Sequence, residues 1–474
     1  MHGALLVLLA DALFVPAGVL TAAFLTRRLG PEGYGIYSLT VSLGMWVEWG
    51  ILAAFSRATI KFVGESRDWR PIGATALRIN TLSGGLAAGA MIAVAGPVAA
   101  LLGEPALATT LRLYATVMLI VLVSSVHNQI LVGKGDFVHR ALSSATYSTA
   151  RMCAVIAFVW LGLGVDGAIV GLGVAAAAGL LVARRFVRPS WRASDFAWQR
   201  LWAYALPLFL FSIGQRMLGF LDLVMLKLLG APTAEIGHYG AAQNVAMALN
   251  FAVLAATPLL LSALTRALRD GERARAQSLV VDTFRLVLLV LPLLAVVAGC
   301  SGEVLTLVSG AQYLPAAVLV PALAAGSLAR SVTMTTSTIQ VAIGQPRLPA
   351  WSVLPIVPLS LVAQWLIIPR YGSPGAAAVT LAGSVATAAL SFLLLQRHWP
   401  VALRVSTLVR ASILCVPAWW LATWWPATGL AVIAKITVLG AVVLLGYGLL
   451  GELDSADRAR IRRLVARARR RLTP

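Results

Sequence analysis

Long apolar stretches follow one another along almost the whole chain, and this feature constrains the fold more than any other. Cutting the chain at its charged and Pro- or Gly-rich gaps leaves about fourteen stretches of the roughly 20 residues that an α-helix needs to cross a bilayer. Only 12% of the residues are charged, whereas soluble domains carry about 25%. We therefore predict an all-α, polytopic membrane protein. The predicted spans are 4–26, 35–56, 79–102, 110–132, 141–163, 165–184, 202–229, 238–265, 283–300, 314–343, 349–368, 374–396, 408–426 and 429–450.

Basic residues are concentrated in alternate loops. Of the 38 Lys and Arg residues, 29 lie in the tail or in loops that follow even-numbered spans, and only Arg27, Arg28, Arg112 and Arg370 lie in the other loops. Because Lys and Arg are retained in the cytoplasm, both termini are predicted to be cytoplasmic. The net charge of +20 is then explained by topology, and no nucleic-acid partner is expected. The first stretch lacks a basic leader, so it is expected to be a retained span and not a signal peptide.

Three glycine turns recur in the same order in the two halves of the chain. Residues 25–35 are echoed by 226–240, the turn at Gly133 by that at Gly344, and 164–168 by 372–376. The matched glycines are 200, 211 and 208 residues apart (30 to 230, 133 to 344 and 167 to 375). Six spans return the chain to its starting side, so the two halves share one orientation and a substrate path is expected between them.

The repeat predicts two pseudo-symmetric six-helix lobes followed by two C-terminal helices. In the tail, apolar residues at helical spacing alternate with arginines, which predicts an amphipathic helix on the inner leaflet, in contact with membrane lipids. A topology anchor is the simpler interpretation of the tail, and a partner-binding role stays open. The predicted parts are an N-lobe 1–186 (spans 1–6), a cytoplasmic linker 187–201, a C-lobe 202–398 (spans 7–12), spans 13 and 14 over 399–451, and the basic tail 452–474.

Four loop motifs carry a resemblance to a known family. They are RRLGPEGYG at 27–35, GKGDF at 133–137, GLGVDGA at 162–168 and IIPRYGSPGAA at 367–377. With these motifs the chain resembles the polysaccharide flippase branch of the multidrug/oligosaccharidyl-lipid/polysaccharide exporter superfamily. The resemblance implies a fourteen-span protein of the bacterial inner (plasma) membrane that moves an undecaprenyl-diphosphate-linked oligosaccharide outward by alternating access. It also implies a role in O-antigen, capsule or exopolysaccharide assembly, with glycosyltransferases and a polysaccharide polymerase as possible partners.

Three arginines lie near the middle of predicted spans, namely Arg151, Arg216 and Arg330. An ionised side chain in hydrocarbon needs a cavity, a partner or a route to the interface. If the three face a cavity between the lobes, their planar donors suit the oxygens of a diphosphate; the alternative is that each pairs with a buried carboxylate or a helix-end carbonyl. Sugar hydroxyls would have possible contacts in the same cavity at Gln243, Asn244, Asn250 and Gln364.

Other charges inside the spans are candidates for coupling or gating. Asp11, Glu48 and Asp222 could titrate during transport, or they could be static ion pairs or water-facing groups. For Arg27, Lys227 and Lys435, near the outer ends of spans, snorkelling to the interface is the default interpretation. The equivalence of Arg27 and Lys227 across the repeat keeps a gating role open.

No motif of a soluble catalytic module is present. A Gly-rich phosphate loop with its Lys-Ser/Thr does not occur, and the five histidines and three cysteines are scattered, so no cofactor, no metal and no enzymatic activity is expected. Three alternatives remain. A drug or cation antiporter of the same superfamily would have twelve spans and an acidic cavity. A membrane polymerase or ligase of lipid-linked glycans would need a large external loop. A non-transporting scaffold would have its three arginines paired and no cavity.

Overall fold

The described part of the chain is helical throughout, as predicted. The computed structural model describes all residues except 1, 192–197, 249–259, 261–262, 402–404 and 453–474, and it leaves out the side chains of 2–15, 53–54, 57, 198–208, 248 and 405. The predicted tail helix therefore lies outside the described residues. The helices of the first half are α1 (His2–Glu65), α2 (Arg70–Leu101), α3 (Ala106–Gly133), α4 (Phe137–Phe158), η1 (Val159–Leu163) and α5 (Gly164–Phe186). Those of the second half are α6 (Trp198–Leu228), α7 (Thr233–Ala248), α9 (Arg273–Leu289), α10 (Leu291–Gly299), α11 (Ser301–Val308), η2 (Ala311–Leu319), α12 (Val320–Ala342), α13 (Leu348–Val353), α14 (Ile356–His398), α15 (Val405–Trp424) and α16 (Ala431–Leu449).

The predicted spans can be followed along these helices. Spans 1 and 2 are the two parts of α1, spans 11 and 12 fall on α13 and α14, and span 10 is η2 with α12. Among the described residues, eight helical stretches are long and apolar enough to cross a membrane, and some of them contain two predicted spans. Their outward faces carry many exposed apolar side chains, such as Leu86, Leu359 and Leu449, which is the surface that lipid requires.

Glycine turns break the chain direction at equivalent places in the two halves. Gly164 has φ 55° and ψ −136°, and its repeat partner Gly372 has φ 57° and ψ −142°. Gly30 (φ 70°) interrupts α1 in the same way, and Pro31 then begins the next helix. Positive φ is easily reached only by glycine, and proline is well suited to the first turn of a helix. The gap predicted after span 1 is therefore a single sharp break and not a loop.

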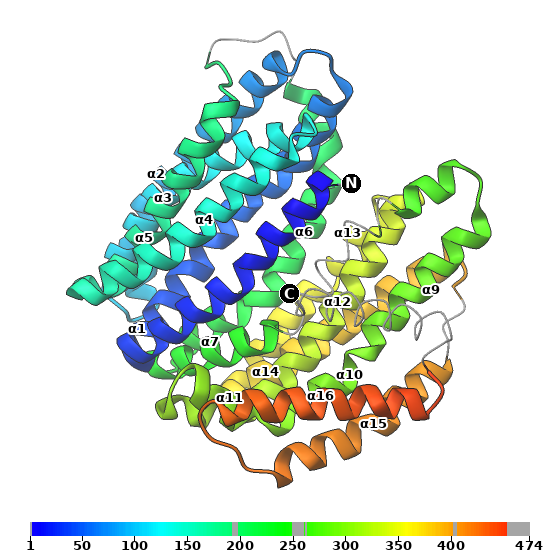
Figure 1. The fold of residues 1–474 in the computed structure, drawn as a ribbon. Coiled ribbons are helices and arrows are strands. Elements are labelled where there is room, and N and C mark those ends of the chain that lie inside the picture. The colour runs from blue at the N-terminus through cyan, green and yellow to red at the C-terminus, as the bar shows by residue number, and fades with distance from the viewer. Residues whose placement is uncertain (1, 192–197, 249–259, 261–262, 402–404, 453–474) are drawn as a thin grey trace, which may run out of the picture.

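The helices form two bundles that lie at an angle to each other (Figure 1). The first bundle contains α1 to α5, and the second contains α7 to α14. Helix α6 joins them, since it packs on α1 of the first bundle as well as on α13 and α14 of the second. The bundles are closest where α1 meets α7, α11 and η2, and they diverge towards the opposite end.

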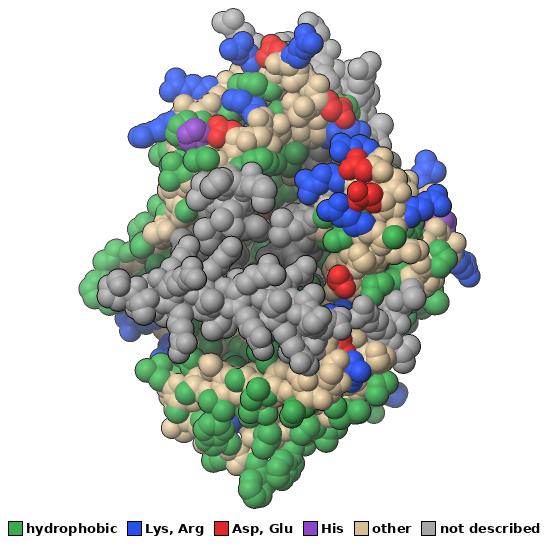
Figure 2. Space-filling model, turned by 45° about the vertical axis from the view of Figure 1, so that its right-hand side comes forward, with side chains coloured by type: hydrophobic (Ala, Val, Ile, Leu, Met, Phe, Trp, Pro, Cys, Tyr) green, Lys and Arg blue, Asp and Glu red, His purple; other side chains and the backbone are tan. Residues whose placement is uncertain are grey.

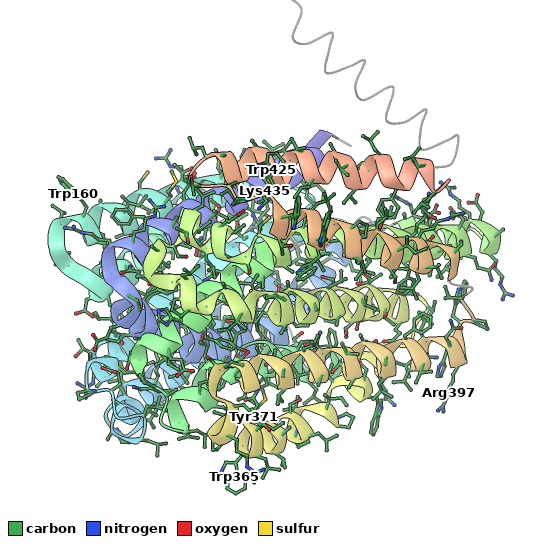
Figure 3. The ribbon with its side chains drawn as sticks, turned by 90° about the horizontal axis from the view of Figure 1, so that it is seen from below. Trp160, Trp365, Tyr371, Arg397, Trp425 and Lys435 are labelled. Atoms are coloured by element: carbon green, nitrogen blue, oxygen red, sulfur yellow. The ribbon has the colours of Figure 1, made fainter. Side chains whose placement is uncertain are left out.

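The two ends of the molecule differ in character. Trp160, beside the Gly164 turn, and Arg397, at the end of α14, lie at opposite ends of the molecule in Figure 3. We call the end with the breaks at Gly30, Gly164 and Gly372 the glycine end and the other the basic end. Figure 2 shows Lys and Arg side chains gathered along the upper and right-hand margins, and hydrophobic side chains over the lower margin. The contacts of α1 with α7, α11 and η2, which join the bundles, lie at the glycine end.

The last two spans are attached to the second bundle by buried charges. Helices α15 and α16 lie side by side (Figures 1 and 3) and pack on α10. Lys435 of α16 is fully buried and donates a 2.6 Å hydrogen bond to Glu303 of α11. Glu303 also accepts a hydrogen bond from the backbone N–H of Ala427. Lys435 therefore does not snorkel to the interface, which corrects the default interpretation of this lysine, because a carboxylate lies within its reach.

Replacing Glu303 with glutamine is expected to destabilise the protein by roughly 3–5 kcal/mol, because the buried Lys435 ammonium would lose its carboxylate partner. Thermal unfolding of the purified protein in detergent measures this change. The double variant Glu303→Gln/Lys435→Met should regain most of the stability, since an apolar side chain needs no partner. Equal melting temperatures for wild type and Glu303→Gln would contradict the pairing.

A second buried carboxylate lies just beyond α16. Glu452 accepts hydrogen bonds from Arg285 (2.8 Å), Arg410 (2.7 Å) and Thr407 (2.7 Å). Burial opposes ionisation of this carboxyl, but the three hydrogen bonds outweigh it and hold the pKa of Glu452 below its ordinary value. The cluster ties the end of α16 to α9 and α15.

The lowered pKa of Glu452 predicts a loss of stability in acid. Its contribution is present above the ordinary glutamate pKa of about 4.3 and is lost as the pH falls through the lower folded-state value. The melting temperature of wild type should therefore fall below about pH 4, and the Glu452→Gln variant should lose less. Glu272→Gln, which removes an exposed carboxylate paired with Arg275, is the control. An acid response of Glu452→Gln equal to that of wild type would contradict the prediction.

Candidate functional site

Arg216 lies in the middle of α6, half-buried against α1. Its guanidinium carbon is 3.7 Å from the ring centroid of Trp49 and 5.3 Å from that of Phe220. Beside Trp49, the buried Glu48 accepts a 2.9 Å hydrogen bond from the Tyr114 hydroxyl and is close enough to Arg216 for their charges to attract. An aromatic face stabilises a guanidinium without using its N–H donors. The stacking thus holds Arg216 in place and leaves its hydrogen-bonding capacity for another acceptor.

Arg330 lies in the middle of α12, where its direct partners are neutral. It donates to the hydroxyl oxygens of Ser327 at 2.8 Å and Ser384 at 3.3 Å. Asp222 of α6 is fully buried and accepts hydrogen bonds from Tyr239 at 2.6 Å and Thr380 at 3.1 Å. The Asp222 charge acts on Arg330 at longer range. Two hydroxyl groups thus solvate the carboxylate, and it forms no contact ion pair with the arginine.

Arg151 lies on α4 and faces the first half of α1. A Cβ atom added to Gly18 would lie 3.2 Å from its guanidinium nitrogen. Arg151 also hydrogen-bonds with Tyr147, one turn earlier on the same helix, and Tyr147 is itself within range of the Glu48 charge. The small residue in α1 is what allows the guanidinium to lie against that helix.

Arg216 lies where α6 packs on α1, whereas Arg330 lies within the second bundle, against Ser384 of α14, and Arg151 lies within the first. The charges of Arg216 and Arg330 are close enough to repel each other, and Arg151 reaches the same region through Tyr147 and Glu48. Within the described part of the chain, neither Arg216 nor Arg330 forms a salt bridge. Three arginines face two carboxylates, so the region keeps an excess of positive charge. Such a cluster suits an anionic group with several oxygens.

At the glycine end, Arg27 connects the bundles. It donates hydrogen bonds from α1 to the carbonyl oxygens of Leu307 and Val308, at the end of α11. A helix C-terminus favours a cation there. The Tyr313 hydroxyl donates back to the carbonyl of Thr26 at 3.1 Å. Arg27 therefore lies at a contact between the bundles, where a gating residue would be placed.

Lys227 makes a second connection at the same end. Its ammonium donates to the hydroxyl oxygen of Thr233 at 2.7 Å and lies 3.4 Å from a carboxylate oxygen of Glu104, in the turn between α2 and α3. Thr233 in turn donates to Glu104. Lys227 and Thr233 belong to α6 and α7, so this triad also joins the bundles.

Glycines let the two main chains touch at this end. A Cβ atom on Gly237 of α7 would overlap the carbonyl oxygen of Pro31, and one on Gly35 would overlap that of Thr233. Two turns beyond Gly237 in α7, the Asn244 amide donates to the Tyr34 hydroxyl at 2.6 Å. The contact is therefore a close one, in which backbone meets backbone.

The residues predicted to contact the glycan differ in their hydrogen bonding. Gln243 is buried and donates to the Gly219 carbonyl at 2.7 Å, and the Asn244 amide is engaged at the contact just described. Gln364 is 2% exposed and its Oε1 has no hydrogen-bond partner among the described residues. Asn250 and the side chain of Asp11 lie outside the described residues.

Several side chains of this region were missed by sequence reasoning. Trp49, Tyr239 and Glu104 are not unusual in their own sequence surroundings, and their partners are between 17 and 167 residues away. For Glu104 a signal existed, since it is an isolated acidic residue in a short turn between two apolar spans.

Two helical bundles that meet at one end and hold charged side chains between them define a polytopic membrane protein of the two-lobed transporter class. The chain belongs to the family of polysaccharide biosynthesis proteins, whose sequence profile matches residues 1–260. The resemblance carried by the four loop motifs is thereby confirmed. A comparison with curated protein sequences finds no match.

Solved transporters share the fold. A structure described as lipid II flippase MurJ in an inward closed conformation matches with a TM-score of 0.79 at 11% identity, covering 94% of this chain and 98% of that one. An inward-facing multidrug resistance MATE family transporter of the MOP superfamily matches with a TM-score of 0.67 at 15% identity, covering 84% and 94%. A MOP superfamily transporter from Pyrococcus furiosus has a TM-score of 0.61 at 15% identity, covering 87% and 95%. At these identities the matches establish the fold.

Proposed function

We propose that the protein is a flippase that moves an undecaprenyl-diphosphate-linked oligosaccharide across the bacterial inner membrane during O-antigen, capsule or exopolysaccharide assembly. The observation that carries the proposal is the pair Arg216 and Arg330, which lie within electrostatic range of each other and have an aromatic ring and hydroxyl groups as their direct partners. A permanently charged planar donor that lacks a contact carboxylate is suited to binding diphosphate oxygens. The family, polysaccharide biosynthesis, fits this cargo.

The arrangement of the bundles supports an alternating-access mechanism. With the basic end in the cytoplasm, as the distribution of Lys and Arg favours, this structure is closed outward and its bundles diverge inward. The headgroup would enter between the bundles and bind the arginines, and the contacts of Arg27 and Lys227 would then break to release it outside. Glycosyltransferases would supply the lipid-linked glycan and a polymerase would consume it.

A drug or cation antiporter is the second candidate, because the fold is shared with MATE family transporters and two carboxylates, Glu48 and Asp222, lie among the arginines. The excess of arginine favours an anionic cargo over a cationic one. A polymerase or ligase is less favoured, since the described connections at the glycine end, such as 102–105, 229–232 and 425–430, are short.

Reconstitution tests the proposal directly. Proteoliposomes containing a fluorescent polyprenyl diphosphate with an attached disaccharide are treated with a membrane-impermeant quencher, which reveals lipid that has reached the outer leaflet. We expect protein-dependent flipping of this lipid and none of a polyprenol without the diphosphate. Efflux of ethidium without any flipping of the diphosphate lipid would contradict the proposal and favour the antiporter.

A further inference from the structure

A pocket of about 490 Å³ lies in the first bundle, between the second half of α1, α3 and α4, with α6 on one side. Its volume falls in the range of small-molecule binding sites. Six serines contribute to its wall and account for much of its polarity: Ser56, Ser124, Ser125, Ser143, Ser144 and Ser212. The cavity is therefore hydroxyl-lined, although it lies within a bundle of apolar helices.

The chemistry of the wall suits an uncharged polar ligand. Serine hydroxyls and the side-chain amides of Asn128 and Gln129 both donate and accept hydrogen bonds. No carboxylate or lysine is among the described lining residues, and Arg140 is the charged residue in the wall. A cation would find no counter-ion in this wall, whereas sugar hydroxyls, which also donate and accept, would find partners on several sides.

Two acceptors in the wall lack a partner. The Oδ1 of Asn128 and the Oε1 of Gln129 form no hydrogen bond among the described residues, and Gln129 is only 6% exposed. The amide nitrogen of Asn128 is engaged, since it donates to the Ser124 carbonyl at 3.0 Å. An unsatisfied buried acceptor costs about 1–3 kcal/mol, so the pocket is built to receive hydroxyl donors.

The pocket adjoins the arginines of the candidate site. Trp49 lines it and carries the Arg216 guanidinium on its ring. Tyr147 lines it as well and hydrogen-bonds with Arg151. A diphosphate held by Arg151 and Arg216 would thus have its first sugars beside this wall.

From this juxtaposition we infer that the serine- and amide-lined pocket of the first bundle binds an uncharged sugar of the lipid-linked glycan, with Asn128 and Gln129 accepting hydrogen bonds from its hydroxyl groups. This inference rests on the proposed function, and it places the glycan contacts in the first bundle instead of at Gln243, Asn244, Asn250 and Gln364. The specificity for the cargo would then reside in α3 and α4.

Binding of short-chain probes to the full-length protein in nanodiscs tests the inference. The probes are farnesyl diphosphate and farnesyl diphosphate linked to glucose, galactose or N-acetylglucosamine, measured by isothermal titration calorimetry. We expect at least one sugar-bearing probe to bind about tenfold more tightly than farnesyl diphosphate, as one additional hydrogen bond to a buried acceptor allows. Gln129→Met should abolish this advantage and leave the affinity for farnesyl diphosphate unchanged.

A matched control and two further probes separate the outcomes. Gln340→Met alters another buried glutamine whose Oε1 lacks a partner, in α12 of the second bundle, and should leave every affinity unchanged. Equal affinities for all four probes, or an unaltered sugar advantage in Gln129→Met, would overturn the sugar pocket but not the proposed function. Failure of every diphosphate probe to bind would overturn both. Tighter binding of a glucuronic acid probe than of the neutral ones, or displacement by tetraphenylphosphonium, would overturn an uncharged ligand.

Discussion

Replacing Arg330 with glutamine is expected to lower the rate of lipid flipping in proteoliposomes by roughly 10- to 100-fold. A hydrogen bond to a charged group contributes about 1.5–3 kcal/mol, and each 1.36 kcal/mol corresponds to about a tenfold change in rate. Arg216→Gln should have a similar effect, because the two guanidinium groups are close enough for their charges to interact. Both variants should retain the wild-type circular dichroism spectrum.

Two comparisons show whether charge at this place is what matters. Arg397→Gln makes the same substitution at an exposed site at the basic end and should flip lipid at the wild-type rate. Arg330→Lys should recover only part of the activity, since lysine keeps the charge and loses the planar donor geometry. Unimpaired flipping by a folded Arg216→Gln/Arg330→Gln double variant would eliminate the arginines as the diphosphate site.

A disulfide across the glycine end should stop transport almost completely. A Cβ atom on Gly240 of α7 would lie 3.2 Å from the Cβ of Ser38 in α1, close to the separation of about 3.8 Å that disulfides prefer. In a background without Cys153, Cys300 and Cys415, the variant Ser38→Cys/Gly240→Cys should lose more than about 90% of its flipping after oxidation, since the bundles can no longer part. Dithiothreitol should restore it.

The matched control places the disulfide inside one bundle. A Cβ atom on Gly302 would lie 3.9 Å from that of Ala317, and both residues belong to the second bundle. Oxidised Gly302→Cys/Ala317→Cys should therefore flip lipid normally. Rapid flipping by the fully oxidised Ser38→Cys/Gly240→Cys protein would contradict opening at the glycine end.

Much of the fold was predictable because hydrophobic length and glycine turns are local signals. The matched glycines Gly164 and Gly372 adopt nearly the same backbone angles, as a repeat found in the sequence requires. The break at Gly30 was predicted in place but not in form, since sequence alone does not distinguish a loop from a single glycine with positive φ. The burial and pairing of Lys435 were not predicted, because its partner Glu303 is 132 residues away in the sequence.

The candidate site was predictable only in part. The cost of burying charge drew attention to Arg151, Arg216 and Arg330, and their role in binding cargo stays a prediction. The stacking of Arg216 on Trp49 depends on how α6 crosses α1. The spacing of residues along the sequence does not predict that crossing. The serine wall of the pocket was overlooked, because serine is common in membrane helices and the six serines, from α1, α3, α4 and α6, come together only in the folded structure.

The backbone contact between Gly237 and Pro31 means that closure at the glycine end and contact with the proposed cargo depend on different parts of the molecule. Closure there depends on the shape of the main chain, whereas under the proposed function the cargo would contact side chains of α3, α4, α6 and α12. Substitutions of those side chains would therefore change which cargo is bound and leave the contact between Gly237 and Pro31 unchanged. If the proposed function holds, a lineage that acquires a new surface sugar could adapt this protein by changing a few interior side chains, without altering the backbone contact that closes it.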